Sequence, residues 1–216
     1  MVCRPGWSGT ATVGAKPRNN QANDKEVKRV KNANPAPFGV MAFGLACLVV
    51  GALFAGWFGA LNAGNMFGSG IVALGTAFIQ LIVVFLMIRG NALADSGLFS
   101  MFGATIFAYF AHVWIVIGFL LLFWKTGVAG PLAFVLLYMA LFSIGYLVYS
   151  ARLKLWSFVV LFVALIIAGG AGFASLFYAW TAGSTIAGYI LLLLSLLALY
   201  ITFVEQLSPV LPKTGS

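Results

Sequence analysis

The sequence predicts an all-α integral membrane protein, a bundle of six transmembrane helices with both termini in the cytoplasm. Three observations lead to this prediction. The chain of 216 residues is 62% hydrophobic and only 7% charged, which is more apolar surface than a water-soluble domain can cover. The apolar residues form six long runs between short polar breaks. The positive charges fall on one side when these runs are threaded through a membrane.

Each run is long enough to cross a bilayer, which takes about 20 mainly apolar residues. In chain order the runs cover residues 38–61, 68–88, 98–124, 128–150, 155–178 and 182–204. They are continuously apolar rather than alternating, which excludes a transmembrane β-barrel. The breaks between them are short, so consecutive helices are expected to be antiparallel neighbours.

Glycine, proline and polar residues mark where the runs begin and end. The first run follows Pro35 and Pro37, and proline suits the first turn of a helix because the amide protons there are unpaired anyway. The later breaks are residues 62–65, 89–95, 125–127, 151–154 and the segment around Thr181.

The positive charges orient the bundle and divide the chain. With the N-terminus inside, all twelve Lys and Arg residues except Lys125 lie on the cytoplasmic side. Residues 1–33 are basic and lack an apolar segment, so they are expected to form a disordered cytoplasmic tail. Residues 34–207 form the predicted six-span transmembrane domain, and residues 208–216 a short cytoplasmic tail. This distribution indicates a plasma-membrane protein that contacts lipid, and not a nucleic-acid-binding protein.

Few side chains in the predicted spans could carry chemistry. His112, the one histidine of the chain, lies in the third run, and Glu205 follows the sixth. No His, Cys, Asp and Glu residues have the spacing of a metal site, and no nucleophile is paired with a base inside a span. The sequence therefore predicts a protein that is not an enzyme and has neither a metal site nor a cofactor.

Each of the two ionisable residues has more than one interpretation. At membrane depth, His112 is a candidate proton carrier or substrate contact, or a neutral imidazole bonded to a neighbouring helix. Glu205 is the second candidate for proton coupling. It is equally interpretable as a surface carboxylate at the cytoplasmic interface, or as the partner of Arg152 or Lys154 in an ion pair.

Glycine and tryptophan residues indicate packing and anchoring. Many of the 25 glycines lie within the runs, where they let helices approach closely. Tryptophans near span ends or along their faces are expected to anchor the protein at the membrane interface. They are Trp57, Trp114, Trp124, Trp156 and Trp180.

The segment that opens the first span carries a resemblance to a known family. Residues 34–43 read N-P-A-P-F-G-V-M-A-F. This is similar to the N-P-A-P-L-G-L-x-x-F opening of the acetate uptake transporter (AceTr) family, the family of the bacterial succinate–acetate permeases. Further agreement at residues 90–91, 99–103, 151–152, 205 and 210–212 extends the similarity over residues 32–213.

The resemblance implies a fold and a function. Family members have six spans with both ends inside, form homo-oligomers that are often hexamers, and transport acetate or, in some members, succinate, generally with protons. The family's narrow hydrophobic point corresponds to Phe43, Phe102 and Leu161. Several residues depart from the pattern. Phe102 stands where the family has tyrosine, and Gly172 where a bacterial member has asparagine. Residues 104–106 lack the usual bulkier aromatic, and Leu86 and Met87 stand near the end of the second span, where glutamate and lysines are usual.

The residues suggest how acetate would pass. Asn34, Thr76, Ser100 and Thr105 are candidates to hold the carboxylate, while the hydrophobic point contacts the methyl group. An anion entering a cell works against about 2.3 kcal/mol per 100 mV, so concentrative uptake needs a co-transported proton or entry as the neutral acid. We therefore expect proton-linked transport of acetate and similar small carboxylates. The alternatives are a passive acetate or anion channel without proton coupling, and a structural or signalling membrane protein.

Overall fold

The structure is a computed structural model that describes residues 35–59, 63–89, 98–123 and 128–207. These residues all belong to one compact unit, Asn34–Ser216. The two tails predicted at residues 1–33 and 208–216 lie outside the described residues, so their structure stays a prediction.

The described part of the chain is helical. The helices are α2 (Ala36–Phe54), α3 (Ala63–Arg89), α5 (Leu98–Leu122), α6 (Ala129–Arg152), α7 (Trp156–Tyr178) and α8 (Thr181–Tyr200), and α8 continues into the π-helix η1 (Ile201–Leu207). Within these ranges, six helices are long and apolar enough to cross a membrane. The predicted all-α fold is thereby confirmed, together with six helices of membrane-spanning length and composition, while the cytoplasmic position of the termini stays a prediction.

The first break differs from the prediction. α2 ends at Phe54 and α3 begins at Ala63, whereas the apolar run continues to residue 61 and the next was expected to begin at residue 68. Gly56 and Gly59 turn the chain with φ angles of 77° and 83°, a conformation that glycine adopts without steric cost. The side-chain amide of Asn65 donates to the carbonyl oxygen of Phe58 at 2.7 Å, which fastens this turn to α3.

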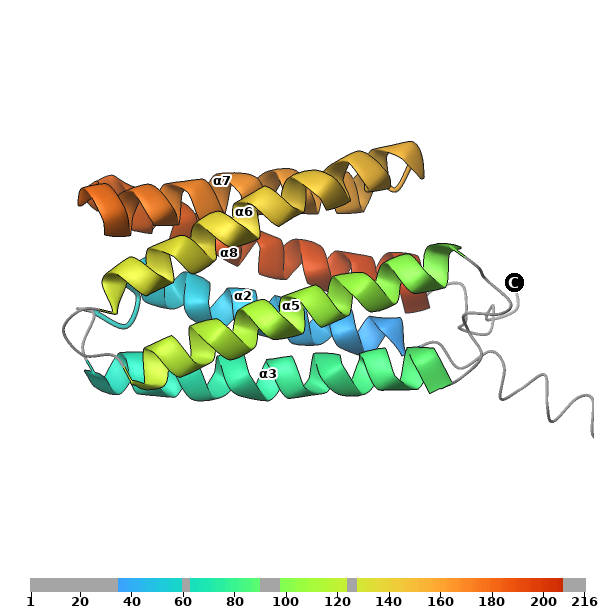
Figure 1. Cartoon of the computed structure of the whole chain (residues 1–216), viewed down its shortest axis with the longest axis horizontal. Helices are drawn as coiled ribbons and strands as arrows, with labels where there is room; N and C mark the ends of the chain where they lie inside the picture. The colour runs from blue at the N-terminus through green and yellow to red at the C-terminus, as the bar shows by residue number, and fades with distance from the viewer. Residues whose placement is uncertain (1–34, 60–62, 90–97, 124–127, 208–216) are drawn as a thin grey trace, which may run out of the picture. The chain divides into compact units, whose positions relative to one another are not determined.

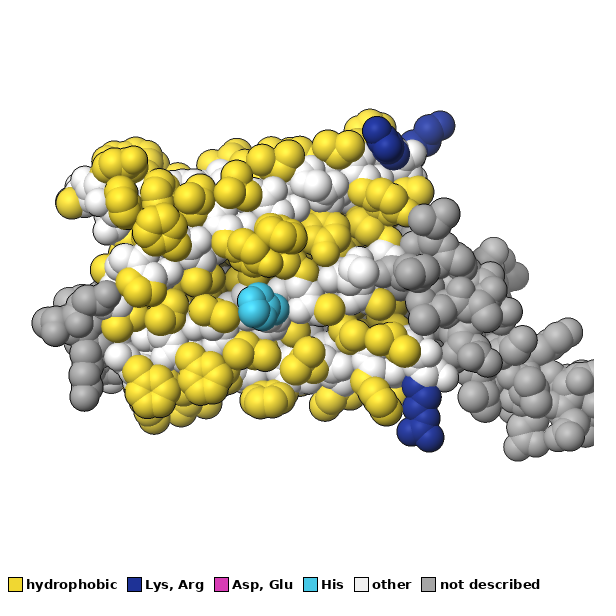
Figure 2. Space-filling model, viewed as in Figure 1, with side chains coloured by type: hydrophobic (Ala, Val, Ile, Leu, Met, Phe, Trp, Pro, Cys, Tyr) yellow, Lys and Arg dark blue, Asp and Glu magenta, His cyan; other side chains and the backbone are white. Residues whose placement is uncertain are grey.

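The helices pack into a bundle in which one pair of neighbouring helices, α5 and α6, is loosely packed; we call this contact the α5–α6 seam. α2 packs against both α3 and α8, α3 packs against α5, and α7 packs against both α6 and α8. α5 and α6 lie next to each other in Figure 1 but contact each other much less than these pairs. α2 and α5 begin at the same end of the bundle, where α3 and α6 finish (Figure 1). Figure 2 shows the described Lys and Arg side chains at that end.

Glycines bring several helices into backbone contact. A Cβ on Gly51 of α2 would lie 2.9 Å from the carbonyl oxygen of Gly188 in α8, and a Cβ on Gly188 would overlap the backbone of Ala55. A Cβ on Gly169 of α7 would lie 2.6 Å from the carbonyl oxygen of Leu136 in α6. The predicted role of glycine in close helix packing is confirmed at these positions.

Apolar side chains also cover the outside of the bundle. Large hydrophobic residues are exposed along the outer faces of the helices, as the space-filling view shows (Figure 2). On α3 they include Phe78, Ile82 and Phe85, which follow one another at helical spacing. A surface of this kind is suited to the hydrocarbon core of a bilayer rather than to water.

Candidate functional site

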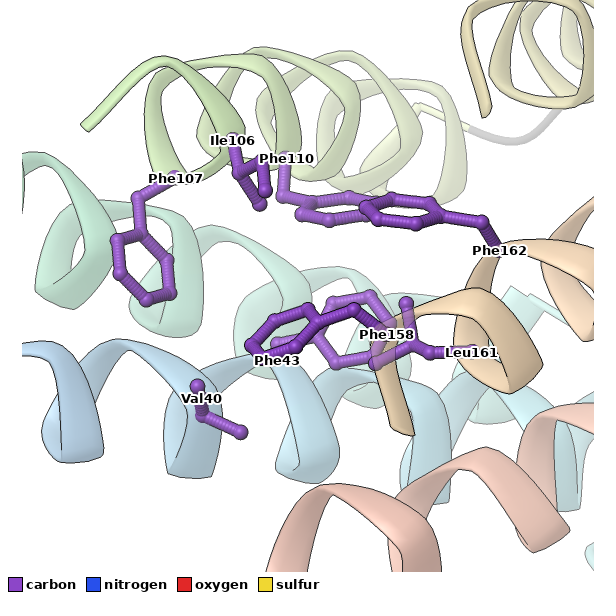
Figure 3. A pocket seen from close by; sticks show the side chains of 8 residues that line it. All are labelled: Val40, Phe43, Ile106, Phe107, Phe110, Phe158, Leu161 and Phe162. Carbon is purple, nitrogen blue, oxygen red and sulfur yellow. The ribbon is translucent and has the colours of Figure 1, made fainter. Parts of the chain in front are cut away.

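The candidate site is a small pocket between α2, α5 and α7, lined by hydrocarbon side chains alone. We call these eight residues the constriction: Val40, Phe43, Ile106, Phe107, Phe110, Phe158, Leu161 and Phe162. Figure 3 shows their side chains converging from the three helices. The cavity they leave is about 10 Å³, which is roughly the space that one water molecule needs.

Aromatic rings close the constriction. The ring centroids of Phe43 and Phe110 are 4.6 Å apart, and Phe110 stacks on Phe162 at 6.4 Å with an interplanar angle of 7°. Spacings of three and four residues place each helix's contributions on one face. The pocket is therefore lined by rings that can rotate.

The opening segment of α2 positions Phe43. The helix begins with proline at its first turn, where the missing amide proton costs nothing. One turn later, a Cβ on Gly39 would lie 2.6 Å from the ring of Phe107, so glycine lets that ring lie directly on α2. Gly39 thus fixes the spacing between α2 and α5 just before Phe43. Asn34, the first residue of the segment, lies outside the described residues.

The structure brings together two of the three residues expected at the narrow hydrophobic point. Phe43 and Leu161 both line the constriction, and both are buried. Phe102 is buried but is not among the lining residues, and its ring packs on Tyr149 at 4.5 Å and on Tyr146 at 5.8 Å. Ile106 and Phe110, one and two helical turns further along α5, line the pocket in its place.

Two of the three hydroxyl groups expected to hold a carboxylate are turned toward their own helices. Thr76 is buried and donates to the carbonyl oxygen of Ala73 at 2.8 Å. Thr105 donates to the carbonyl oxygen of Phe102 at 2.8 Å, and its side chain is exposed. Each proton is therefore already shared inside a helix. The side chain of Ser100 lies outside the described part of the structure.

His112 lies on the outside of the bundle. Its side chain is exposed on α5, and its ring stands edge-on to Tyr138 of α6 at 6.4 Å. Figure 2 shows this imidazole among hydrophobic side chains on the outer face. It is not among the residues that line the constriction. The side chain of Glu205, the second candidate for proton coupling, lies outside the described part of the structure.

Buried polar atoms form a set that sequence reasoning missed. Among the described residues, three such atoms have no hydrogen-bond partner: Gln80 Oε1, Trp114 Nε1 and Ser150 Oγ. Gln80 is fully buried in α3, and its Nε2 donates a long bond of 3.5 Å to the carbonyl oxygen of Gly39. Trp114 is 1% exposed, so the expectation that it anchors the protein at the membrane interface is wrong.

The described residues offer no metal site, because no group of three His, Cys, Asp or Glu side chains lies together there. What the constriction can do follows from its hydrocarbon lining. It can exclude water and ions while closed, and it can contact the apolar part of a small solute when its rings turn.

These features define a class: a helical membrane protein with a narrow, apolar constriction inside its bundle. A solved structure, "Structure of the bacterial acetate channel SatP", matches the chain with a TM-score of 0.65 and 23% sequence identity, covering 83% of this chain and 98% of that one. This likeness confirms the fold that the family resemblance implied. The matched protein is described as an acetate channel. No protein-family model and no curated protein matches the sequence.

Proposed function

We propose that the chain conducts acetate, or a monocarboxylate of similar size, across a membrane through the constriction. The observation that carries this proposal is a ring of hydrocarbon side chains between α2, α5 and α7, inside a fold that matches that of an acetate channel. The opening segment that resembles the acetate uptake transporter family supplies Val40 and Phe43 to this ring.

The chemistry of acetate suits the ring. Acetate has one methyl group, which gains from contact with phenylalanine and leucine side chains. At about 10 Å³ the pocket is closed to acetate, so passage requires the rings of Phe43, Phe110 or Phe162 to rotate. Because the lining is apolar, hydrated inorganic ions lose their water without compensation and are rejected.

A passive, channel-like pathway is favoured over proton-linked transport. The eight lining side chains hold no group that can take up or release a proton. His112, the residue first considered as proton carrier, has its side chain on the outer face of α5. Proton-linked transport therefore remains the second candidate, and it predicts a response to a pH gradient that a passive pathway lacks.

We further propose that the protein lies in the plasma membrane with both termini in the cytoplasm. Arg89 ends α3, Arg152 ends α6, and Lys154 follows two residues after Arg152. These helix ends lie at the same end of the bundle (Figure 1), and clustered basic residues mark the cytoplasmic side.

A homo-oligomer accounts for the exposure of His112. An imidazole that faces lipid in the middle of a span is unfavourable, and such groups usually lie against protein. We propose that a second copy of the chain covers this face of α5, in a ring of subunits such as the hexamer that the family resemblance implies. The oligomeric state of the protein in membranes tests this proposal, and a monomer would overturn it.

The decisive experiment measures labelled-acetate uptake into liposomes that contain the purified protein. An imposed voltage is compared with an imposed pH gradient of equal driving force. We expect uptake to follow the voltage, because the pathway conducts the anion. Uptake that follows only the pH gradient would overturn the channel in favour of proton-linked transport, and uptake no greater than in empty liposomes would overturn acetate conduction.

A variant ties the conduction to the constriction. Phe43→Ala removes the ring that packs on Phe110, so we expect acetate conduction to rise and larger carboxylates such as succinate to enter. Phe78→Ala serves as the matched control, because Phe78 is a phenylalanine that is 60% exposed on α3. Equal conduction in both variants would place the pathway elsewhere in the bundle.

A further inference from the structure

We infer that Trp114 is a substrate-positioning residue whose indole N–H donates a hydrogen bond to the carboxylate of the substrate. The inference rests on the proposed function and adds to it a binding group and a selectivity for monocarboxylates. Three properties of this side chain carry it: its burial without a partner, its place beside the constriction, and the chemistry of its one polar atom.

The burial of Trp114 is unusual for a residue that only packs. Its side chain is 1% exposed, and Nε1 has no hydrogen-bond partner among the described residues. Trp114 belongs to the buried hydrophobic cluster of the bundle, and no described residue accepts a hydrogen bond from its Nε1. A buried donor without an acceptor is unfavourable, and most such groups in proteins are satisfied. Phenylalanine would fill much of this space without that cost, so the N–H calls for another explanation.

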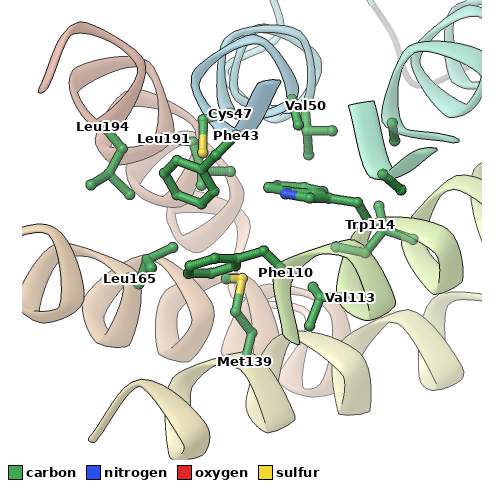
Figure 4. Packing of buried hydrophobic residues seen from close by; sticks show 14 of the residues in the cluster. Phe43, Cys47, Val50, Phe110, Val113, Trp114, Met139, Leu165, Leu191 and Leu194 are labelled. Carbon is green, nitrogen blue, oxygen red and sulfur yellow. The ribbon is translucent and has the colours of Figure 1, made fainter. Parts of the chain in front are cut away.

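Trp114 lies one helical turn beyond the constriction. It follows Phe110 by four residues on α5, so the two side chains share one face of the helix. Its ring centroid is 6.2 Å from that of Phe43. Figure 4 shows the indole reaching from α5 toward α2, with its nitrogen on the side nearer Phe43 in this view. A solute that has passed the rings of Phe43 and Phe110 therefore meets this N–H next.

The indole N–H complements the constriction chemically. A hydrogen bond from a neutral N–H to a carboxylate is strengthened by the charge of the anion, while the methyl group of acetate can stay against Phe43 and Phe110. Because the donor carries no full charge, it holds the anion without trapping it, as conduction requires. A second carboxylate on the same solute would have to lie in the hydrocarbon ring, where it has no partner. The indole N–H of Trp114 and the hydrocarbon lining of the constriction together thus favour a monocarboxylate with a short apolar end.

The test removes the donor and keeps the shape. In Trp114→Phe the N–H is lost, and we expect the apparent affinity for acetate to fall about tenfold, as for one charge-assisted hydrogen bond. A second variant places benzothienylalanine at position 114, which keeps the two fused rings and replaces the N–H with sulfur, and we expect the same loss. Trp57→Phe is the matched control, because Trp57 is 60% exposed and we expect no change there.

A spectroscopic measurement separates binding from packing. The six tryptophans are replaced with 5-fluorotryptophan, and the fluorine resonance that Trp114→Phe removes is assigned to position 114. We expect sodium acetate to shift this resonance in a saturable way while sodium chloride does not.

The outcomes distinguish the inference from the proposed function. Acetate conduction in the unchanged protein, with equal affinity in all three variants and no acetate-dependent shift, would overturn the role of Trp114 alone. A loss in Trp114→Phe that the benzothienylalanine variant restores would show that volume matters and the donor does not, which also overturns it. Absence of conduction in the unchanged protein would overturn the proposed function, and this inference with it.

Discussion

Two helix contacts in this bundle are made in opposite ways. α2 and α8 meet through glycines, so that the backbone of one helix lies on the backbone of the other at Gly51 and Gly188. α5 and α6 pack less closely, and large rings bridge them, including Phe102 on Tyr149 at 4.5 Å and Tyr109 on Phe142 at 5.4 Å. At these two glycines the first contact is made by backbone, whereas large side chains that can rotate make the second.

The difference indicates which side of the pathway moves. Helices in backbone contact separate only by losing many close contacts at once, so α2 and α8 form a fixed wall. Ring rotation can widen the contact between α5 and α6 while the helices stay in place. The constriction lies between these two regions, because α2 supplies Phe43 and α5 supplies Phe110. We therefore expect the pathway to open on its α5 side.

The largest expected effect is the loss of stability when the close contact between α2 and α8 is disrupted. Gly188→Leu forces a side chain into the backbone of α2, and we expect a loss of about 3 kcal/mol in stability, at the upper end for overpacking. Gly170→Leu is the matched control, because a Cβ there meets nothing within 4 Å. Thermal unfolding in detergent measures both. Equal melting temperatures for the two variants would contradict the fixed wall.

A smaller effect is expected when a bridging ring is removed. Tyr146 of α6 contacts Phe102 and Tyr109 of α5 and stacks on Phe162 of the constriction at 5.5 Å. Tyr146→Ala should cost about 2 kcal/mol, since it removes three aromatic pairs that each contribute toward the lower end of about 0.5–1.5 kcal/mol. It should also raise acetate conduction, because Phe162 loses the ring that stacks on it. Tyr200→Ala, at an exposed tyrosine, is the control for both measurements. Unchanged conduction would mean that the seam does not govern the constriction.

Removing the hydroxyl group of Tyr109 tests the contact between α5 and α6 with a smaller substitution. It donates to the carbonyl oxygen of Met139 in α6 at 3.1 Å. Tyr109→Phe keeps the ring and removes this bond, so we expect a loss of about 0.6 kcal/mol, the average for such bonds within membranes. Unfolding of this variant is compared with that of Tyr138→Phe, whose ring is partly exposed. A loss as large as that of Tyr146→Ala would show that hydrogen bonding, and not ring packing, joins α5 to α6.

The smallest effect is expected at Thr76. Its hydroxyl donates within its own helix, so Thr76→Val should change acetate conduction by less than about twofold. Flux measurements on liposomes with equal protein content decide this. A loss of tenfold or more would restore Thr76 as a carboxylate contact.

The fold could be predicted from the sequence because bilayer thickness dictates the length of an apolar run. The exact end of α2 could not, since Gly56 and Gly59 take their positive φ angles in a segment that is as apolar as a helix. The hydrophobic composition alone does not mark such a turn. The six predicted runs nevertheless correspond to the six helices that are long enough to span.

The site was harder to predict than the fold. Phe102, Ile106 and Phe110 share one face of α5, and any of them could meet Phe43. Which one does depends on how far α5 is displaced along its axis relative to α2, a quantity that no local pattern encodes. Only one weak indication that Trp114 is buried is present in the sequence: the residue lies in the middle of a predicted span and not at its ends.

The unequal lengths of α2 and α3 tie the pathway to the thickness of the membrane. With 19 and 27 residues, and a rise of 1.5 Å per residue, they measure about 28 Å and about 40 Å, against a hydrocarbon core of about 30 Å. α2 matches this core, whereas α3 must tilt or extend beyond it. α3 packs on both α2 and α5, the helices that supply Phe43 and Phe110. Lipids with longer chains would therefore change the tilt of α3 and, through it, the separation of those two rings.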